Sequence, residues 1–111
     1  MDTITSSADV TRVFKEGKRF GRGSSALLVL KRTRQHGLQG RVAFVAGKKL
    51  GNAVWRNRAK RRMRAACQRL HGPWQGYDIV FIANKYTTEV EFEKLVADYG
   101  RTLSRIGMEA E

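Results

Sequence analysis

Basic side chains are the chemically distinctive residues of this sequence, and they are concentrated between positions 48 and 70. This stretch reads KKLGNAVWRNRAKRRMRAACQRL and contains no Asp or Glu. At helical spacing its cations find no acidic partner three or four residues away, so they repel one another. A polyanion would remove that penalty, which favours nucleic-acid binding. The alternative is a solvated surface helix, although such surfaces usually mix both signs of charge.

The charge of the whole chain follows the same pattern. The formal net charge is +12, and sixteen of the 22 Lys and Arg residues lie between positions 17 and 77, a range without Asp or Glu. Such a field can steer a polyanion towards the protein and hold it. An anionic membrane surface could also use this field. A membrane-surface helix, however, carries large hydrophobic side chains opposite its basic face, and here that face is rich in alanine.

Side chains suited to catalysis by the protein alone are scarce. A metal-dependent nuclease needs carboxylates gathered around cations, whereas Asp78 stands alone at the start of a predicted strand. A nucleophile needs a base held beside it, but Cys67 lies on an apolar helix face and His36 in a polar loop. His71 lies at a helix C-terminus, where a positive charge is ordinarily favourable. We therefore predict no catalytic residue and no metal site in the protein.

Length and composition indicate one domain spanning residues 1–111. With 41% hydrophobic residues the chain can bury a core. Its apolar runs are too short to cross a bilayer, and the start of the chain lacks the basic and apolar regions of a signal peptide. The single cysteine permits no intrachain disulfide. We expect a cytoplasmic protein with no membrane contact and no obligate protein partner.

The basic stretch is predicted to form an amphipathic helix that begins at Gly51-Asn52 and ends with Gly72 as the C′ residue. Its apolar arc comprises Trp55, Ala59, Met63, Ala66, Cys67 and Leu70, and its cationic face comprises Asn57, Arg58, Lys60, Arg61, Arg62, Arg64 and Arg69. Arg56 projects near the apolar arc, so we expect it to bend outward at the helix start. The modest apolar arc is suited to packing on a sheet.

Two more helices and a sheet are predicted around it. One helix is capped by Ser6 or Ser7, and another begins at Thr88, whose spacing to Glu91 is that of a capping box. Strong strand patterns occupy residues 25–31, 41–47 and 77–83, and residues 18–25 form a turn or a short edge strand. We expect the first two strong strands to pair as a hairpin. With helices mostly on one face, this is an α+β sandwich.

The second strong strand separates two kinds of side chain. Val42, Phe44 and Ala46 are predicted to face one way, and Ala43, Val45 and Gly47 the other. The second set is small and smooth, which suits either a shallow groove or a tightly packed sheet face.

The basic stretch closely resembles the signature of the protein component of bacterial ribonuclease P. The shared pattern is Lys48-Lys49-x-Gly51-Asn52-Ala53-Val54-x-Arg56-Asn57-Arg58-x-Lys60-Arg61-Arg62-x-Arg64. The likeness continues in Val13-Phe14-Lys15-x-Gly17 and in Gly76-Tyr77-Asp78-Ile79-Val80. Because so many positions agree at set spacing, a chance match is improbable.

The resemblance implies a fold and a function that composition does not reveal. The fold would be a two-layer α/β sandwich in the order α-β-β-β-α-β-α, ribosomal protein S5 domain 2-like, with a left-handed crossover against the usual rule of hand. The partner would be a catalytic RNA subunit, and the complex an endoribonuclease that removes the 5′ leader of precursor tRNA. The active centre and its Mg²⁺ ions would belong mainly to the RNA.

The resemblance also assigns residues to two surfaces. Those contacting the catalytic RNA would be Lys48, Lys49, Asn52, Arg56, Asn57, Arg58, Lys60, Arg61, Arg62 and Arg64. Those lining a groove for the single-stranded leader, between the first helix and the sheet, would be Val10, Phe14, Leu28, Val45 and Gly47. The family often has aromatic residues where Val10 and Leu28 stand, and serines where Val45 and Gly47 stand. Stacking energy of about 1–3 kcal/mol per base therefore cannot be carried over to this groove.

Two other functions fit the same charge field. One is a structural RNA-binding protein such as a ribosomal component, and the other is a DNA-binding module. No dimerisation zipper or repeat accompanies the basic helix, and a folded RNA rewards closely packed Arg and Asn, so the residues favour RNA.

Overall fold

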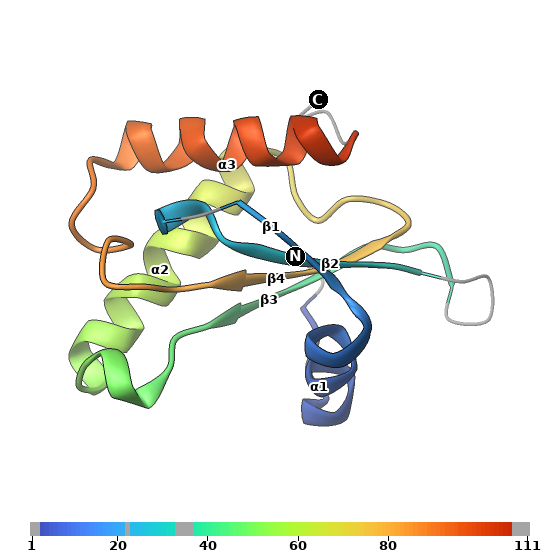
Figure 1. Cartoon of the computed structure of the whole chain (residues 1–111), viewed down its shortest axis with the longest axis horizontal. Helices are drawn as coiled ribbons and strands as arrows, with labels where there is room; N and C mark the ends of the chain where they lie inside the picture. Colours follow the sequence, from blue (N-terminus) through green and yellow to red (C-terminus); the bar gives the residue numbers. More distant parts are fainter. Residues whose placement is uncertain (1–2, 22, 33–36, 108–111) are drawn as a thin grey trace.

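A computed structural model of the chain describes residues 3–21, 23–32 and 37–107. In that part, helices cover both faces of one mixed sheet, with α3 above it and α1 below it in Figure 1. The elements are α1 (Ser7–Glu16), β1 (Lys18–Phe20), the 3-10 turn η1 (Gly23–Ser25), β2 (Leu27–Lys31), β3 (Arg41–Val45), the 3-10 turn η3 (Lys48–Leu50), α2 (Ala53–Arg69), β4 (Tyr77–Ile82) and α3 (Phe92–Ile106). The predicted order α-β-β-β-α-β-α is confirmed, and residues 18–20 form the short edge strand.

The strand order corrects one prediction. The sheet runs β1-β2-β4-β3, with β1–β2 and β2–β4 antiparallel and β3–β4 parallel. The predicted hairpin between β2 and β3 is therefore wrong, because β4 lies between them. The side chains of Ile79, Val80 and Phe81 are fully buried on the two faces of β4, and only a central strand is covered on both faces and both edges. The left-handed sense of the β3–α2–β4 crossover stays a prediction.

Alternation along the strands divides the core between two faces. Leu27, Val42 and Phe81 point to the face covered by α2 and α3, where Met63, Leu95 and Tyr99 complete the larger cluster. Leu28, Ala43 and Val80 point to the other face and form a smaller cluster with Ile4 and Val13 of the N-terminal segment and α1. The predicted division of β3 is confirmed for Val42, Ala43, Phe44 and Val45, and most of the helical cover lies on one face.

The two ends of α2 show how the basic helix is held in place. The Oδ1 atom of Asn52 accepts a hydrogen bond of 2.9 Å from the Trp55 amide, so the predicted helix start is confirmed. At the other end His71 adopts a left-handed φ of 64°, and the Gly72 amide donates to the Cys67 carbonyl. This is a Schellman ending with His71, not Gly72, as the C′ residue.

Close packing, rather than backbone conformation, requires glycine at position 72. Adding one methyl group there should therefore destabilise the fold. A Cβ atom at Gly72 would lie 2.5 Å from the Cys67 Sγ atom and 2.7 Å from the Trp74 ring. Gly72→Ala should therefore lower the free energy of unfolding by about 1–3 kcal/mol, measured by urea denaturation.

The matched control for that change is Gly100→Ala in the middle of α3. There the nearest atom to a new Cβ is Leu70 Cδ2 at 3.5 Å, an ordinary contact. Helix propensity then predicts stabilisation by about 0.5–1 kcal/mol. Equal effects of the two substitutions would contradict the packing explanation for Gly72.

The start of α3 also differs from its prediction. The helix begins at Phe92 with Glu91 as N-cap, and no side chain caps it. Thr88 is not the N-cap, because its Oγ1 atom accepts a 2.9 Å hydrogen bond from Trp55 Nε1 of α2. The predicted capping box is wrong since Thr88 has a tertiary partner that local spacing cannot reveal. The contact ties the segment before α3 to the first turn of α2.

Candidate nucleic-acid interface

The outward side of α2 carries cations without acidic partners. Arg58 and Arg61 are exposed, Lys60 is half-buried, and none of the three forms an ion pair with any carboxylate in the described chain. The exposed side chains of Lys48, Lys49 and Asn57 extend this surface around the helix start. The predicted cationic face is thus present and unneutralised, which suits contact with crowded phosphates.

Two arginines of α2 are exceptions. Arg69 forms an ion pair of 2.8 Å with Glu93 of α3. Arg62 turns towards the segment before α3, where it donates to the Thr87 carbonyl at 2.8 Å and also to the Val90 carbonyl. Burial, and next the charge of Arg58, lower the pKa of the Arg62 guanidinium. The prediction that Arg62 belongs to the outward face is therefore wrong, because backbone carbonyls of the neighbouring segment bind its guanidinium.

Arg62 should consequently affect stability more than nucleic-acid affinity. Arg62→Ala removes two charge-assisted hydrogen bonds and leaves two carbonyls unpaired, so we expect a loss of about 2 kcal/mol in the free energy of unfolding. The salt dependence of RNA binding should stay close to that of the parent chain. If Arg62→Ala reduced the salt dependence of RNA binding as much as Arg61→Ala does, and left the free energy of unfolding unchanged, Arg62 would belong to the RNA-binding surface.

Three further residues that were predicted to contact RNA, Asn52, Arg56 and Arg64, are engaged or partly buried within the protein itself. Asn52 caps α2, as described above. Arg56 is half-buried and its Nε atom is buried without a hydrogen-bond partner in the described chain, so the expectation that it bends outward is wrong for the inner part of the side chain. The Arg64 guanidinium lies 5.3 Å from the centre of the Phe44 ring, a cation–π distance that draws it towards β3.

A pocket of about 300 Å³ adjoins this side of α2. Its walls are the N-terminal segment, α1, β3 and α2, which contribute Thr3, Ile4, Val10, Ala43, Phe44, Val45, Lys60 and Arg64. The wall is apolar on the α1 and β3 sides and cationic on the α2 side. This combination suits an unstacked nucleotide whose phosphate faces Lys60 and Arg64.

The structure places only part of the predicted groove in this pocket. Val10 and Val45 line it. Leu28 is 7% exposed in the smaller core cluster, so it supports the sheet face rather than lining a surface. Phe14 is an exposed residue of α1, 47% accessible, and Gly47 is exposed just before η3, and neither lines the pocket. Thr3 and Ile4 also line the pocket, which the sequence did not predict. An isolated isoleucine near the start of the chain is the only sequence signal for this part of the wall.

A buried ionic network lies where α1 meets the sheet. Asp78 of β4 is fully buried, and Arg32 Nη1 lies 2.8 Å and Arg41 Nη2 2.9 Å from its carboxylate oxygens. Arg12 of α1 approaches to 3.8 Å, and Arg41 also pairs with Asp9 of α1 at 3.2 Å. Asp78 does not stand alone, as its position in the sequence suggested, because three arginines distant in the chain surround it.

The network fixes the position of α1 relative to β3 and β4. Burial opposes ionisation of Asp78, but hydrogen bonds from Arg41 and Arg32 outweigh it, so the pKa of the carboxyl lies below its ordinary value. The hydrogen bond to Asp78 likewise raises the pKa of Arg41. Because α1 forms one wall of the pocket, this network positions the pocket as well as stabilising the fold.

The sequence of this chain is similar to a known protein family. A family profile described as Ribonuclease P matches residues 2–107. The chain belongs to the ribonuclease P protein family. The ribonuclease P protein component of Symbiobacterium thermophilum is 39% identical over 100 residues, which cover 86% of this chain and 83% of the relative.

Solved structures of the ribonuclease P protein family have the same fold. The RNase P protein from Thermotoga maritima superposes with a TM-score of 0.78 at 28% identity, covering 95% of this chain and 97% of that one. The RNase P protein from Staphylococcus aureus, at 23% identity, gives a TM-score of 0.79 over 96% of this chain and 95% of that one, which supports the fold alone. Family membership favours the ribonuclease P hypothesis over the ribosomal and DNA-binding alternatives.

Cys67 and His71 are the cysteine and histidine within the described residues of this ribonuclease P family member. Burial raises the pKa of the Cys67 thiol to about 12, so the nucleophilic thiolate is not formed at neutral pH. His71 is exposed at the end of α2, and His36 lies outside the described residues. Within residues 3–21, 23–32 and 37–107, no three His, Cys, Asp or Glu side chains gather as metal ligands. No helix in those ranges has the length and apolar character needed to cross a membrane.

Proposed function

We propose that this chain is the RNA-binding protein subunit of a ribonucleoprotein ribonuclease P, which removes the 5′ leader of precursor tRNA. The observation that carries the proposal is the unneutralised cationic face of α2 in a member of the ribonuclease P protein family. An endonuclease acting on tRNA precursors would work in the cytoplasm.

The two surfaces of the site would have separate roles. Arg58 and Arg61, together with Lys48 and Lys49, would bind phosphates of the catalytic RNA, and Lys60 lies at the border of the two surfaces. The pocket beside Lys60 and Arg64 would bind the single-stranded leader. Its one aromatic wall residue is Phe44, whose ring is already contacted by Arg64. The leader would therefore be held mainly by phosphate contacts and apolar packing, and only weakly by base stacking.

The hydrolytic step is assigned to the RNA subunit. The described residues offer no gathered carboxylates for a magnesium ion, so we infer that Mg²⁺ is held mainly by the RNA. When bound there, the ion would activate water and stabilise the leaving oxygen. The protein would raise the local concentration of precursor by binding the leader next to that centre, and its cations would reduce phosphate repulsion between the two RNAs.

A reconstitution experiment tests this proposal. The purified chain is combined with the catalytic RNA of its own organism, and cleavage of a precursor tRNA is measured at low magnesium concentration. We expect faster cleavage with the protein than without it, because phosphate repulsion is least screened when magnesium is scarce.

Two comparisons make the outcome decisive. A precursor without a leader should compete less strongly for the complex than one with a leader. Cleavage that the protein leaves unchanged at every magnesium concentration would reject the proposed function. Comigration of the protein with a ribosomal subunit in cell extract would instead favour the ribosomal alternative.

A further inference from the structure

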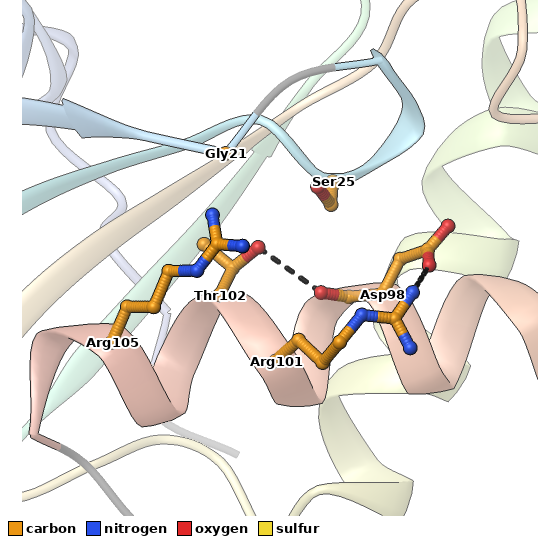
Figure 2. A pocket seen from close by; sticks show the side chains of 6 residues that line it. All are labelled: Gly21, Ser25, Asp98, Arg101, Thr102 and Arg105. Atoms are coloured by element: carbon orange, nitrogen blue, oxygen red, sulfur yellow. Dashed lines mark hydrogen bonds and ion pairs between the residues drawn. The ribbon is translucent and has the colours of Figure 1, made fainter.

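A second hollow, of about 310 Å³, lies on the other side of the sheet from α1. It is bounded by the turn that follows β1 and by the second half of α3, and it is lined by Gly21, Ser25, Asp98, Arg101, Thr102 and Arg105 (Figure 2). β1 and β3 are the two edge strands of the sheet. Because the hollow adjoins β1 and the leader pocket adjoins β3, the two sites lie at opposite edges.

The charge of this hollow is positive. Arg101 and Arg105 lie one turn apart on α3, and Asp98 is the one acidic residue among the described residues that line the hollow. Asp98 accepts a hydrogen bond from Arg101 and lies 3.5 Å from Lys94 Nζ, so its charge is already matched. Arg105, in contrast, has no hydrogen-bond or ion-pair partner within the described residues, and in Figure 2 it points towards Gly21. Among residues 3–21, 23–32 and 37–107, the Arg105 guanidinium is therefore without a partner, and Arg101 offers the edge that does not contact Asp98.

The walls of the hollow are fixed in place. Gly21 has a left-handed φ of 78°, and a Cβ atom there would lie 2.3 Å from the Ser25 carbonyl oxygen, so the turn closes tightly only with glycine. The Asn84 side chain donates to the Gly23 carbonyl, which ties η1 to the end of β4. Thr102 is 3% exposed, and its Oγ1 atom donates to the Asp98 carbonyl at 3.0 Å. The described walls of the hollow are thus held by contacts within the chain before any ligand binds.

We propose that this hollow binds a phosphate group through Arg105 and the free edge of Arg101. A guanidinium presents paired N–H donors that match two phosphate oxygens, and both arginines line the same hollow. Asp98 acts as a positioning residue, because its hydrogen bond with Arg101 holds that guanidinium beside the Asp98 carboxylate (Figure 2). The volume of about 310 Å³ lies at the lower end of the range for small-ligand sites.

The phosphate could belong to an RNA strand or to a free phosphate or nucleotide. A phosphodiester in this site would not be part of the leader segment in the pocket beside Lys60, because the two sites lie at opposite edges of the sheet. The protein would then hold RNA at both edges of the sheet.

Titration with inorganic phosphate, followed by amide chemical shifts of the full chain, tests the site directly. We expect saturable shifts at Gly21 and Thr102. The double variant Arg101→Gln/Arg105→Gln should weaken phosphate affinity at these amides at least about tenfold. The control Arg58→Gln/Arg61→Gln has the same net charge and should leave the affinity at Gly21 and Thr102 unchanged. Unsaturable shifts, or equal weakening by the two double variants, would overturn the proposal.

A second titration with a short single-stranded RNA separates the two sources of phosphate. If RNA shifts the same amides and the Arg101→Gln/Arg105→Gln variant lowers the salt slope of RNA binding by about 1, the ligand is an RNA phosphodiester. If inorganic phosphate shifts them and RNA does not, the ligand is a free phosphate compound. Neither titration involves cleavage, so the results of both titrations are independent of the reconstitution experiment. Unchanged shifts elsewhere in the chain confirm that the variants are folded.

Discussion

Asp78→Asn will lower the free energy of unfolding by about 3–5 kcal/mol, because it removes a fully buried carboxylate that compensates two arginines. Asparagine has nearly the same shape, so the change leaves Arg32 and Arg41 beside a neutral group without opening a cavity. Urea denaturation of the variant and the parent chain at neutral pH measures the difference.

Glu93→Gln is the matched control for this substitution. Glu93 also pairs with an arginine, but both partners are more than half exposed. A solvent-exposed pair of this kind contributes far less to stability than a buried one. Equal losses from the two variants would show that burial of Asp78 does not strengthen its ion pairs.

The contribution of Asp78 should also make the free energy of unfolding depend on pH. The pKa of Asp78 is lower in the folded chain than in the unfolded chain. Its stabilising contribution is therefore complete above its ordinary pKa of about 4, and it is lost as the pH falls below that value. Between about pH 4 and pH 2 the parent chain should lose more stability than Asp78→Asn. Parallel curves over that interval would contradict this assignment.

Arg58→Ala combined with Arg61→Ala will weaken binding to the catalytic RNA by about 100-fold at low salt. Both side chains are exposed on α2 and have no acidic partner in the described part of the chain. Each lost charged contact with phosphate should cost about tenfold in affinity and reduce the salt slope by about 0.7–0.9. Filter binding across a range of salt concentrations measures both quantities.

Arg69→Ala supplies the control for the loss of an arginine from the same helix. Arg69 is paired with Glu93, and its hydrogen bond with that carboxylate raises its pKa. The affinity and the salt slope should change little. If Arg69→Ala weakened binding as much as a single change at Arg58 or Arg61, net charge rather than the outward face of α2 would explain the binding.

Local signals in the sequence were sufficient for most of the elements. The 3.6-residue period placed Ala59, Met63 and Cys67 on the buried side of α2, and all three are fully buried. The amide-capping side chain of Asn52 and the alternation along β3 are equally local. Each of these features depends on residues within one or two turns or within one strand, so a short window of sequence contains the information.

Contacts between residues distant in the chain could not be predicted from local spacing. Arg62 has the spacing of an outward cation, yet carbonyls 25 and 28 residues away bind its guanidinium. Thr88 has the spacing of an N-cap, yet it accepts a hydrogen bond from Trp55. In both cases a tertiary contact replaces the interaction that the local spacing predicts.

The sequence alone determined that a cationic helix without acidic neighbours exists in this protein, because charge and periodicity are properties of consecutive residues. Only the tertiary structure decided that β4 separates β2 from β3, that Arg12, Arg32 and Arg41 meet at Asp78, and which of the cations remain outward. These outcomes depend on the pairing of strand edges and the burial of one carboxylate, and both arise when distant segments exclude water between them.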